Sequence, residues 1–156
     1  MGERAIAAVS AALRDTLAAA LLNAPPLIDH DDKVILASPV EVPHDRHTRL
    51  CIFLYRIHEH VLSRPEAMQI KGPLGFVLSY LIVPIGPDAE RCQHMLGRVL
   101  RTMHEHAELQ IPEAGGELSL SLLRHPLEEA IHLWSALDIP YQCALYYEVR
   151  IVKVGD

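Results

Sequence analysis

Two His-Glu-His runs, residues 58–60 and 104–106, are the first groups in this sequence that could do chemistry. Neutral imidazole is a common ligand of zinc and other divalent metals. If residues 58–60 lie in a strand, His58 and His60 point to the same face, where they could hold an ion. Neither run has the HExxH spacing that places two imidazoles on one side of a helix beside a catalytic base.

The second His-Glu-His run falls at the end of a predicted helix. Residues two apart are about 200° apart around a helix axis, so His104 and His106 diverge. A helix C-terminus also favours positively charged side chains. We therefore interpret both runs as solvated side chains and expect no metal site. Metal ligation by His58 and His60 remains the alternative.

Motifs for nucleophilic catalysis and for phosphate binding are missing from the sequence. It has no GxSxG elbow and no glycine-rich loop of the Walker or Rossmann type. Cys51, Cys92 and Cys143 are odd in number and far apart, which fits neither a disulfide framework nor a CxxC zinc site. Because each lies in an apolar run, we expect three buried free thiols. We expect no catalytic residue and no cofactor, that is, a protein that is not an enzyme.

A group of arginines lies on the polar side of one predicted helix, and the sequence leaves its role open. Arg91, Arg98 and Arg101 lie on neighbouring turns with His94, and Gly97 stands among them. Glycine in a helix interior costs about 1 kcal/mol relative to alanine. Two explanations stay open. Either another backbone approaches the helix at Gly97, with the arginines facing a partner, or the residues form an ordinary solvated face.

The elements that would position these residues follow from the hydrophobic pattern. Apolar residues spaced three and four apart predict helices over 6–21, 92–103 and 125–137. Apolar runs and alternation predict strands over 34–36, 49–61, 74–83, 118–122 and 141–154. We expect Pro84 to end the third of these strands. The buried side of the last helix is expected to carry Leu127, Ile131, Trp134 and Leu137.

This order of elements predicts one α/β domain spanning residues 1–156. Its sheet is expected to be mixed and mostly antiparallel, packed with about three α-helices. The length of 156 residues and the apolar half of the composition suffice for a real core and exclude a disordered chain. The two strands over 49–61 and 74–83 are apolar on both faces, so we expect them at the centre of the sheet.

Charge and the N-terminal sequence limit the partners. The chain has 20 acidic against 14 basic residues, a net charge of −6, which disfavours binding to nucleic acid. The N-terminal helix carries Glu3, Arg4, Arg14 and Asp15 among its alanines. We therefore expect neither a signal peptide nor a membrane span, and we expect the protein to fold in the cytoplasm.

Four blocks of sequence, in this order and spacing, resemble one protein family. They are Ile52 to Tyr55 with Glu59, Gly72 to Leu74 with Leu78 to Leu81, His94 to Leu100, and Leu133 to Leu137 with Tyr146 and Tyr147. The set is similar to the tail-terminator, or cap, proteins of extracellular contractile injection systems of the antifeeding-prophage and virulence-cassette type. The resemblance runs from the first helix to the last strand, and it extends to the tail terminators of contractile phages.

The resemblance implies a structural protein with a terminator-like α/β fold. Family members form a six-fold ring on the distal end of the inner tube and sheath, where they end polymerisation. The implied partners are further copies of the chain in a homohexameric ring, the inner tube and the sheath. Neither nucleic acid nor a membrane is implied. The protein would assemble in the cytoplasm and become part of the released particle.

The candidate contacts between subunits, or with the sheath, combine the resemblance with the residue patterns. They are Arg91, Gly97, Arg98 and Arg101 of the predicted helix, Arg56 of the first long strand and Tyr146 of the last strand. Tyr146 is included because it alternates with the predicted core stripe. We expect glutamate at positions 98 and 101 to leave the stability of the isolated chain unchanged.

Two departures from the family pattern and two alternatives remain. His60 stands where an asparagine is expected after the glutamate, and Arg56 and His58 make the polar face of this strand more basic than is typical. The chain also ends directly after the last strand, whereas several family members carry a C-terminal extension, so we expect either a compact member or a truncated one. The alternatives are another structural adaptor of the same particle and a metal-dependent cytoplasmic enzyme.

Overall fold

One sheet with helices on both faces makes up the fold. The computed structural model describes residues 3–60, 75–112 and 118–152. In chain order the elements are α1 (Ala5–Leu22), β1 (Val34–Leu36), β2 (Arg49–His60), β3 (Gly75–Ile85), α2 (Ala89–Glu105), β4 (Glu108–Leu109), β5 (Leu118–Leu122), α3 (Leu127–Leu137) and β6 (Leu145–Val152). Two single-turn 3₁₀ helices, Asp31–Lys33 and Pro39–Glu41, flank β1.

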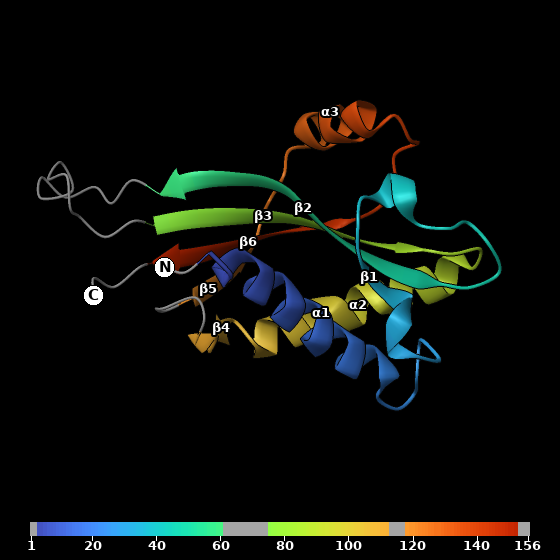
Figure 1. The fold of residues 1–156 in the computed structure, drawn as a ribbon. Helices are drawn as coiled ribbons and strands as arrows, with labels where there is room; N and C mark the ends of the chain where they lie inside the picture. Colours follow the sequence, from blue (N-terminus) through green and yellow to red (C-terminus); the bar gives the residue numbers. More distant parts are fainter. Residues whose placement is uncertain (1–2, 61–74, 113–117, 153–156) are drawn as a thin grey trace, which may run out of the picture.

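The strands lie in the order β1-β2-β3-β6-β5-β4, with the three longest at the centre (Figure 1). The short β1 runs parallel to β2, and the other neighbouring strands are antiparallel. The expected mixed, mostly antiparallel sheet with three helices is therefore confirmed. The two-residue β4 was not expected, because a pair of residues leaves no periodic signal.

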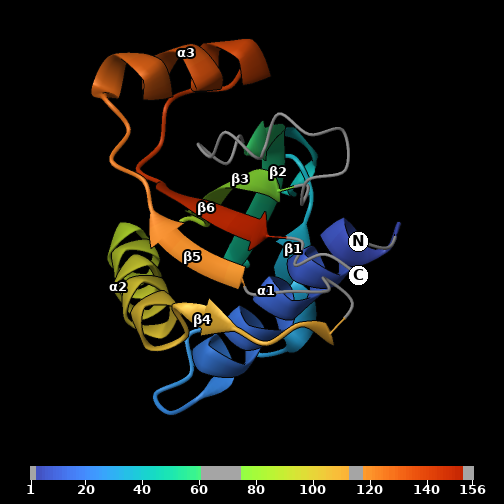
Figure 2. The same ribbon diagram turned by 90° about the vertical axis from the view of Figure 1, so that its left-hand side faces the viewer.

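Helices α1 and α2 cover one face of the sheet (Figures 1 and 2). Their apolar stripes pack on every second residue of the central strands. This main core includes Leu13, Leu17, Leu50, Ile52, Leu78, Tyr80, Met95, Val99, Val149 and Ile151. Helix α1 is long and apolar enough, at 18 residues and a mean hydropathy of 1.6, to meet the length and composition criteria of a membrane span. Its stripe is buried against the sheet, as in a core helix of a globular domain.

Helix α3 lies over the opposite face and forms a second, smaller core with the alternate residues of the strands (Figure 1). Only Ala130 and Trp134 of this helix are fully buried. Leu127 and Ile131 are 62% and 46% exposed, so the expected buried side was wrong for these two residues. The reason is that α3 rests on the sheet along a narrow line.

A β-bulge at Tyr55 changes which side chains of β2 face α3. Leu54 is opposite Tyr80, whereas Arg56 is opposite Ser79, so Tyr55 is the extra residue. An extra residue breaks the alternation of side chains between the two faces. Tyr55 and Arg56 consequently line the same hollow on the α3 side of the sheet.

Strand boundaries differ from expectation at two places. Pro84 does not end β3, which continues to Ile85 with Pro84 opposite Leu50 of β2. Pairing between β3 and β6 stops at Ile82, so β3 has only one neighbour at Pro84 and needs no second hydrogen-bond donor there. Strand β6 begins at Leu145, not at residue 141. The expected strand residues 61, 74, 153 and 154 lie outside the described residues.

Candidate functional site

Gly97 lies at the centre of the exposed face of α2. At 100° per residue, His94, Leu100, Arg101 and His104 surround it on the helix surface. All of these residues are exposed. A Cβ atom added at Gly97 would meet nothing within 4 Å. The glycine is therefore not required by packing inside this chain, and the helix surface is shallow at this point.

Arg98 does not share that exposed face, and its expected exposure was wrong. Its side chain is only 9% exposed and turns toward the end of α1. The Nη1 atom donates to the carbonyl oxygens of Ala20 at 3.3 Å and Asn23 at 2.9 Å. Carbonyls at a helix C-terminus lack intrahelical donors and carry partial negative charge, so they attract a guanidinium. A glutamate at position 98 would disrupt the contact between α1 and α2 and lower the stability of the isolated chain. The expectation that this substitution leaves the stability unchanged was therefore wrong.

The two remaining arginines of α2 are both exposed but lie apart. Arg101 is beside Gly97, and its Nε lies 3.8 Å from Oε1 of Glu105. Such an exposed pair contributes little to stability and leaves the arginine free to reorient. Arg91 lies about 120° around the helix from Gly97, on the same side as Arg98. The structure therefore brings Gly97 and Arg101 together and places Arg91 on a different side of the helix.

Tyr146 is also buried, at 7% exposure, so its expected exposed position was wrong. Its hydroxyl accepts a hydrogen bond of 3.0 Å from Nε1 of Trp134. The ring of His125 packs against it edge-on, with ring centroids 4.7 Å apart. Burial raises the pKa of the Tyr146 hydroxyl. The alternation of β6 predicted the correct face for Tyr146, but α3 covers that face.

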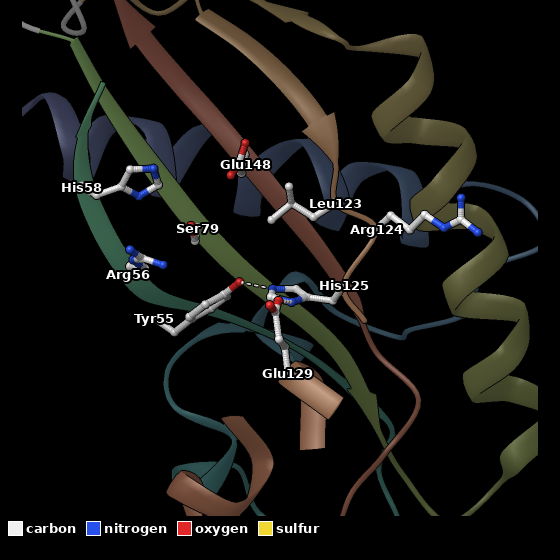
Figure 3. A pocket seen from close by; sticks show the side chains of 9 residues that line it. All are labelled: Tyr55, Arg56, His58, Ser79, Leu123, Arg124, His125, Glu129 and Glu148. Atoms are coloured by element: carbon white, nitrogen blue, oxygen red, sulfur yellow. Dashed lines mark hydrogen bonds and ion pairs between the residues drawn. The ribbon is translucent and has the colours of Figure 1, made fainter. Parts of the chain in front are cut away.

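Arg56 lines a hollow of about 260 Å³ on the face of the sheet that α3 covers in part (Figure 3). The other lining residues come from three strands, β2, β3 and β6, and from the segment between Leu123 and Glu129: Tyr55, His58, Ser79, Leu123, Arg124, His125, Glu129 and Glu148. The two carboxylates already have cationic or polar neighbours within the chain. Glu129 Oε2 is 3.2 Å from His125 Nδ1, and Glu148 Oε2 is 3.7 Å from Arg150 Nη2.

A hydrogen-bonded chain in this hollow joins β2 to α3 (Figure 3). Tyr55 and His125 are linked at 3.0 Å from Oη to Nε2. When His125 donates from Nδ1 to Glu129, its Nε2 accepts from the Tyr55 hydroxyl. Burial raises the pKa of Tyr55, which keeps the hydroxyl protonated as that donor. The arrangement holds α3 to the sheet. Of its two contacts, the sequence signals only the one between His125 and Glu129, which are spaced one helical turn apart.

The histidines of the two His-Glu-His runs have different surroundings in the structure. His58 Nδ1 is buried without a hydrogen-bond partner among the described residues, and His106 Nδ1 lies 2.8 Å from the Thr102 carbonyl oxygen. Within residues 3–60, 75–112 and 118–152, no three His, Cys, Asp or Glu side chains are grouped as metal ligands. Cys51 is buried, but Cys92 is half-buried and Cys143 is exposed. The expectation of three buried thiols was wrong because Cys143 lies outside the strand in which it was placed.

The solved structures with a fold similar to this chain include two tube-terminating proteins. The first is the sheath/tube terminator of an extracellular contractile injection system, PVC, in the extended state, with a TM-score of 0.68 and 17% sequence identity. The second is the tube-terminating cap of the anti-feeding prophage, with a TM-score of 0.62 and 16% identity. They are matched over 100% and 95% of this chain. The chain spans only 59% and 55% of the lengths of those two proteins.

Sequence comparison gives a more direct result. No curated protein matches the chain significantly. The family model described as the Pvc16 N-terminal domain matches residues 8–156, which is nearly the whole chain. This match and the two similar folds confirm the resemblance seen in the sequence. The chain belongs to the Pvc16 N-terminal domain family.

Proposed function

We propose that this protein is a structural cap that ends the inner tube and sheath of a contractile injection particle. The observation that carries the proposal is the extent of the family match, residues 8–156, on a fold similar to two terminator proteins. In this proposal residues 1–156 form one terminator-like domain. The protein assembles with the particle in the cytoplasm and leaves the cell as part of it.

A cap that closes a tube must match the rotational symmetry of the tube. We propose a homohexameric ring, in which each subunit contacts its neighbour through two different surfaces. The exposed candidates on α2, Gly97 and Arg101, are proposed as part of that contact. Arg91 and Arg56 are proposed to contact the neighbouring subunit, the tube or the sheath. Arg98 and Tyr146 are left out because both are buried within the chain.

Electron microscopy of particles made without this protein tests the proposed function. We expect tubes and sheaths of uncontrolled length, or open distal ends, and restoration of uniform length when the protein is added back. Uniform, closed particles in its absence would contradict a capping role and would favour another structural adaptor. Baseplate morphology serves as the internal control, since loss of a distal cap leaves the opposite end intact.

We also infer that the protein has no enzymatic activity. Its hollow at Tyr55 and His125 holds α3 to the sheet, and Tyr55 keeps its proton. The test is metal analysis of the purified chain together with the variant in which His58 and His60 are both alanine. One equivalent of zinc in the wild type that is lost in the variant would support the alternative of a metal-dependent enzyme.

A further inference from the structure

Helix α3 exposes an apolar pair next to an unpaired carboxylate. Leu127 and Ile131 lie one turn apart and are 62% and 46% exposed. Glu128 lies beside them on the outer side of the helix and has no ion-pair partner among the described residues. We call Leu127, Glu128 and Ile131 the α3 strip. The two side chains lie at the edge of the side that carries the buried Ala130 and Trp134, and large apolar side chains that stay so exposed indicate a contact surface.

Helix α2 presents a surface of matching shape and opposite charge. Gly97 leaves open space at the centre of its exposed face. Leu100, 38% exposed, and Arg101 lie one turn further along the same face. We call Gly97, Leu100 and Arg101 the α2 notch. A side chain placed over Gly97 would contact the helix backbone directly, because no Cβ intervenes.

The strip and the notch have the same spacing along their helices. Leu127 and Ile131 are four residues apart, about 6 Å, and Gly97 and Arg101 are also four residues apart. In an antiparallel arrangement Ile131 lies over Gly97 and Leu127 lies beside Leu100. The Glu128 carboxylate then meets the Arg101 guanidinium, whose ion-pair partner among the described residues is the exposed Glu105, at 3.8 Å.

We propose that the occupant of the α2 notch is the α3 strip of a second copy of this chain. The two helices lie on opposite faces of the sheet (Figures 1 and 2), so a copy cannot satisfy its own notch. Such a contact is head-to-tail, and repeated with a closing rotation it generates a ring. The inference rests on the proposed function, because it names the two surfaces that join neighbouring subunits of the cap.

Cysteine cross-linking tests which surfaces meet. Cys92→Ser and Cys143→Ser remove the accessible thiols, and Cys51 stays buried. In this background Gly97→Cys and Ile131→Cys are made in separate chains and treated with a short bismaleimide, at high protein concentration and on capless particles. We expect a cross-linked dimer only when the two chains are mixed. A chain that carries both cysteines should give a ladder that ends at the number of subunits in the ring.

Two other outcomes have separate meanings. Closed rings or capped particles without the mixed cross-link would overturn the α2–α3 contact and leave the proposed function intact. Particles that remain uncapped with the wild-type protein would overturn the proposed function, and this inference with it. Cross-linking at Val40→Cys, which is exposed on a 3₁₀ turn, is the matched control and should give no dimer in either mixture.

Charge substitution gives a second test without added cysteines. Leu127→Asp combined with Ile131→Asp should weaken ring formation roughly tenfold or more, since an apolar contact would receive two charges. Because both residues are exposed, the melting temperature of the isolated chain should stay nearly unchanged. Glu128→Arg should weaken the ring and Arg101→Glu should restore it in the same chain. Unchanged assembly of the double aspartate variant would contradict the proposal.

Discussion

The Arg98 guanidinium donates to the carbonyl oxygen of Asn23 at 2.9 Å, across 75 residues of sequence. The bond joins the side of α2 that the sequence predicts to be exposed to Asn23, the C-cap residue of α1. The same Nη1 also donates to the carbonyl oxygen of Ala20 at 3.3 Å. It supplies a charged donor to carbonyls at a helix C-terminus, where no backbone donor follows. Arg98 is therefore part of the packing between α1 and α2, while Arg101, three residues later, is exposed and pairs with Glu105.

Removing the Arg98 guanidinium should destabilise the isolated chain. Arg98→Met keeps most of the aliphatic stem but loses both hydrogen bonds, and bonds to charged groups contribute about 1.5–3 kcal/mol. Arg101→Met is the matched control and should change the free energy of unfolding by no more than about 0.5 kcal/mol. Urea unfolding of both variants measures the difference. Equal stability of the two variants would show that the bond to α1 is not made.

Loss of the Tyr146 hydroxyl should loosen α3. In Tyr146→Phe, the buried Nε1 of Trp134 loses its acceptor at 3.0 Å, and a buried unpaired donor costs about 1–3 kcal/mol. Trp134 is the single tryptophan of the chain, so its fluorescence reports directly on α3. We expect red-shifted emission and a lower unfolding midpoint. Tyr141→Phe, at a half-exposed tyrosine packed on the same tryptophan, should leave both readings nearly unchanged.

Two glycines should respond to alanine in opposite directions. A Cβ at Gly86 would lie 2.5 Å from Oγ1 and 2.9 Å from Cβ of the buried Thr48, so Gly86→Ala should destabilise by about 1–3 kcal/mol. Gly97→Ala meets open space in a helix interior and should stabilise the isolated chain by about 0.5–1 kcal/mol. Thermal unfolding of the monomer measures both. A destabilised Gly97→Ala chain would mean that the helix surface there is not open.

Asp45 should make stability depend on pH in the acid range. Its hydrogen bond from Arg49 lowers the pKa of the carboxyl from 3.8 to about 2. A carboxyl whose pKa is lower in the folded state stabilises the fold above its unfolded pKa and loses that effect as pH falls through the folded value. The wild type should exceed Asp45→Asn in stability at pH 6. That difference should shrink between pH 4 and pH 2, as measured by urea unfolding at each pH.

The three thiols should react in a fixed order. Cys143 is exposed, whereas burial raises the pKa of Cys51 to about 12, so Cys51 has almost no thiolate at neutral pH. We expect a thiol reagent to modify Cys143 quickly, Cys92 more slowly and Cys51 only after unfolding. Mass spectrometry of partly modified protein identifies the order. Rapid modification of Cys51 in the folded chain would contradict its packing beneath the Ala37 segment, where its thiol lies 3.1 Å from the Ala37 carbonyl oxygen.

Much of the fold could be predicted from the sequence, because periodicity depends on local geometry. The stripes of α1 and α2 follow the 3.6-residue repeat, and β2 and β3 are apolar on both faces as central strands must be. The family resemblance was also contained in four blocks of sequence and is confirmed by the match over residues 8–156. The exposed position of Gly97 needed no structure either, since it lies opposite the stripe of Met95 and Val99.

What only the tertiary structure decided is which polar or alternating residues are covered. Nothing local to α2 says that Arg98 will meet the end of α1, because that contact depends on how two helices cross on the sheet. Tyr146 alternates correctly in β6, yet it is buried because α3, reached through a separate connection, lies over it. Leu127 and Ile131 look like core residues in sequence and are exposed in the fold. Burial depends on long-range packing, and the helical repeat determines only which residues share a side.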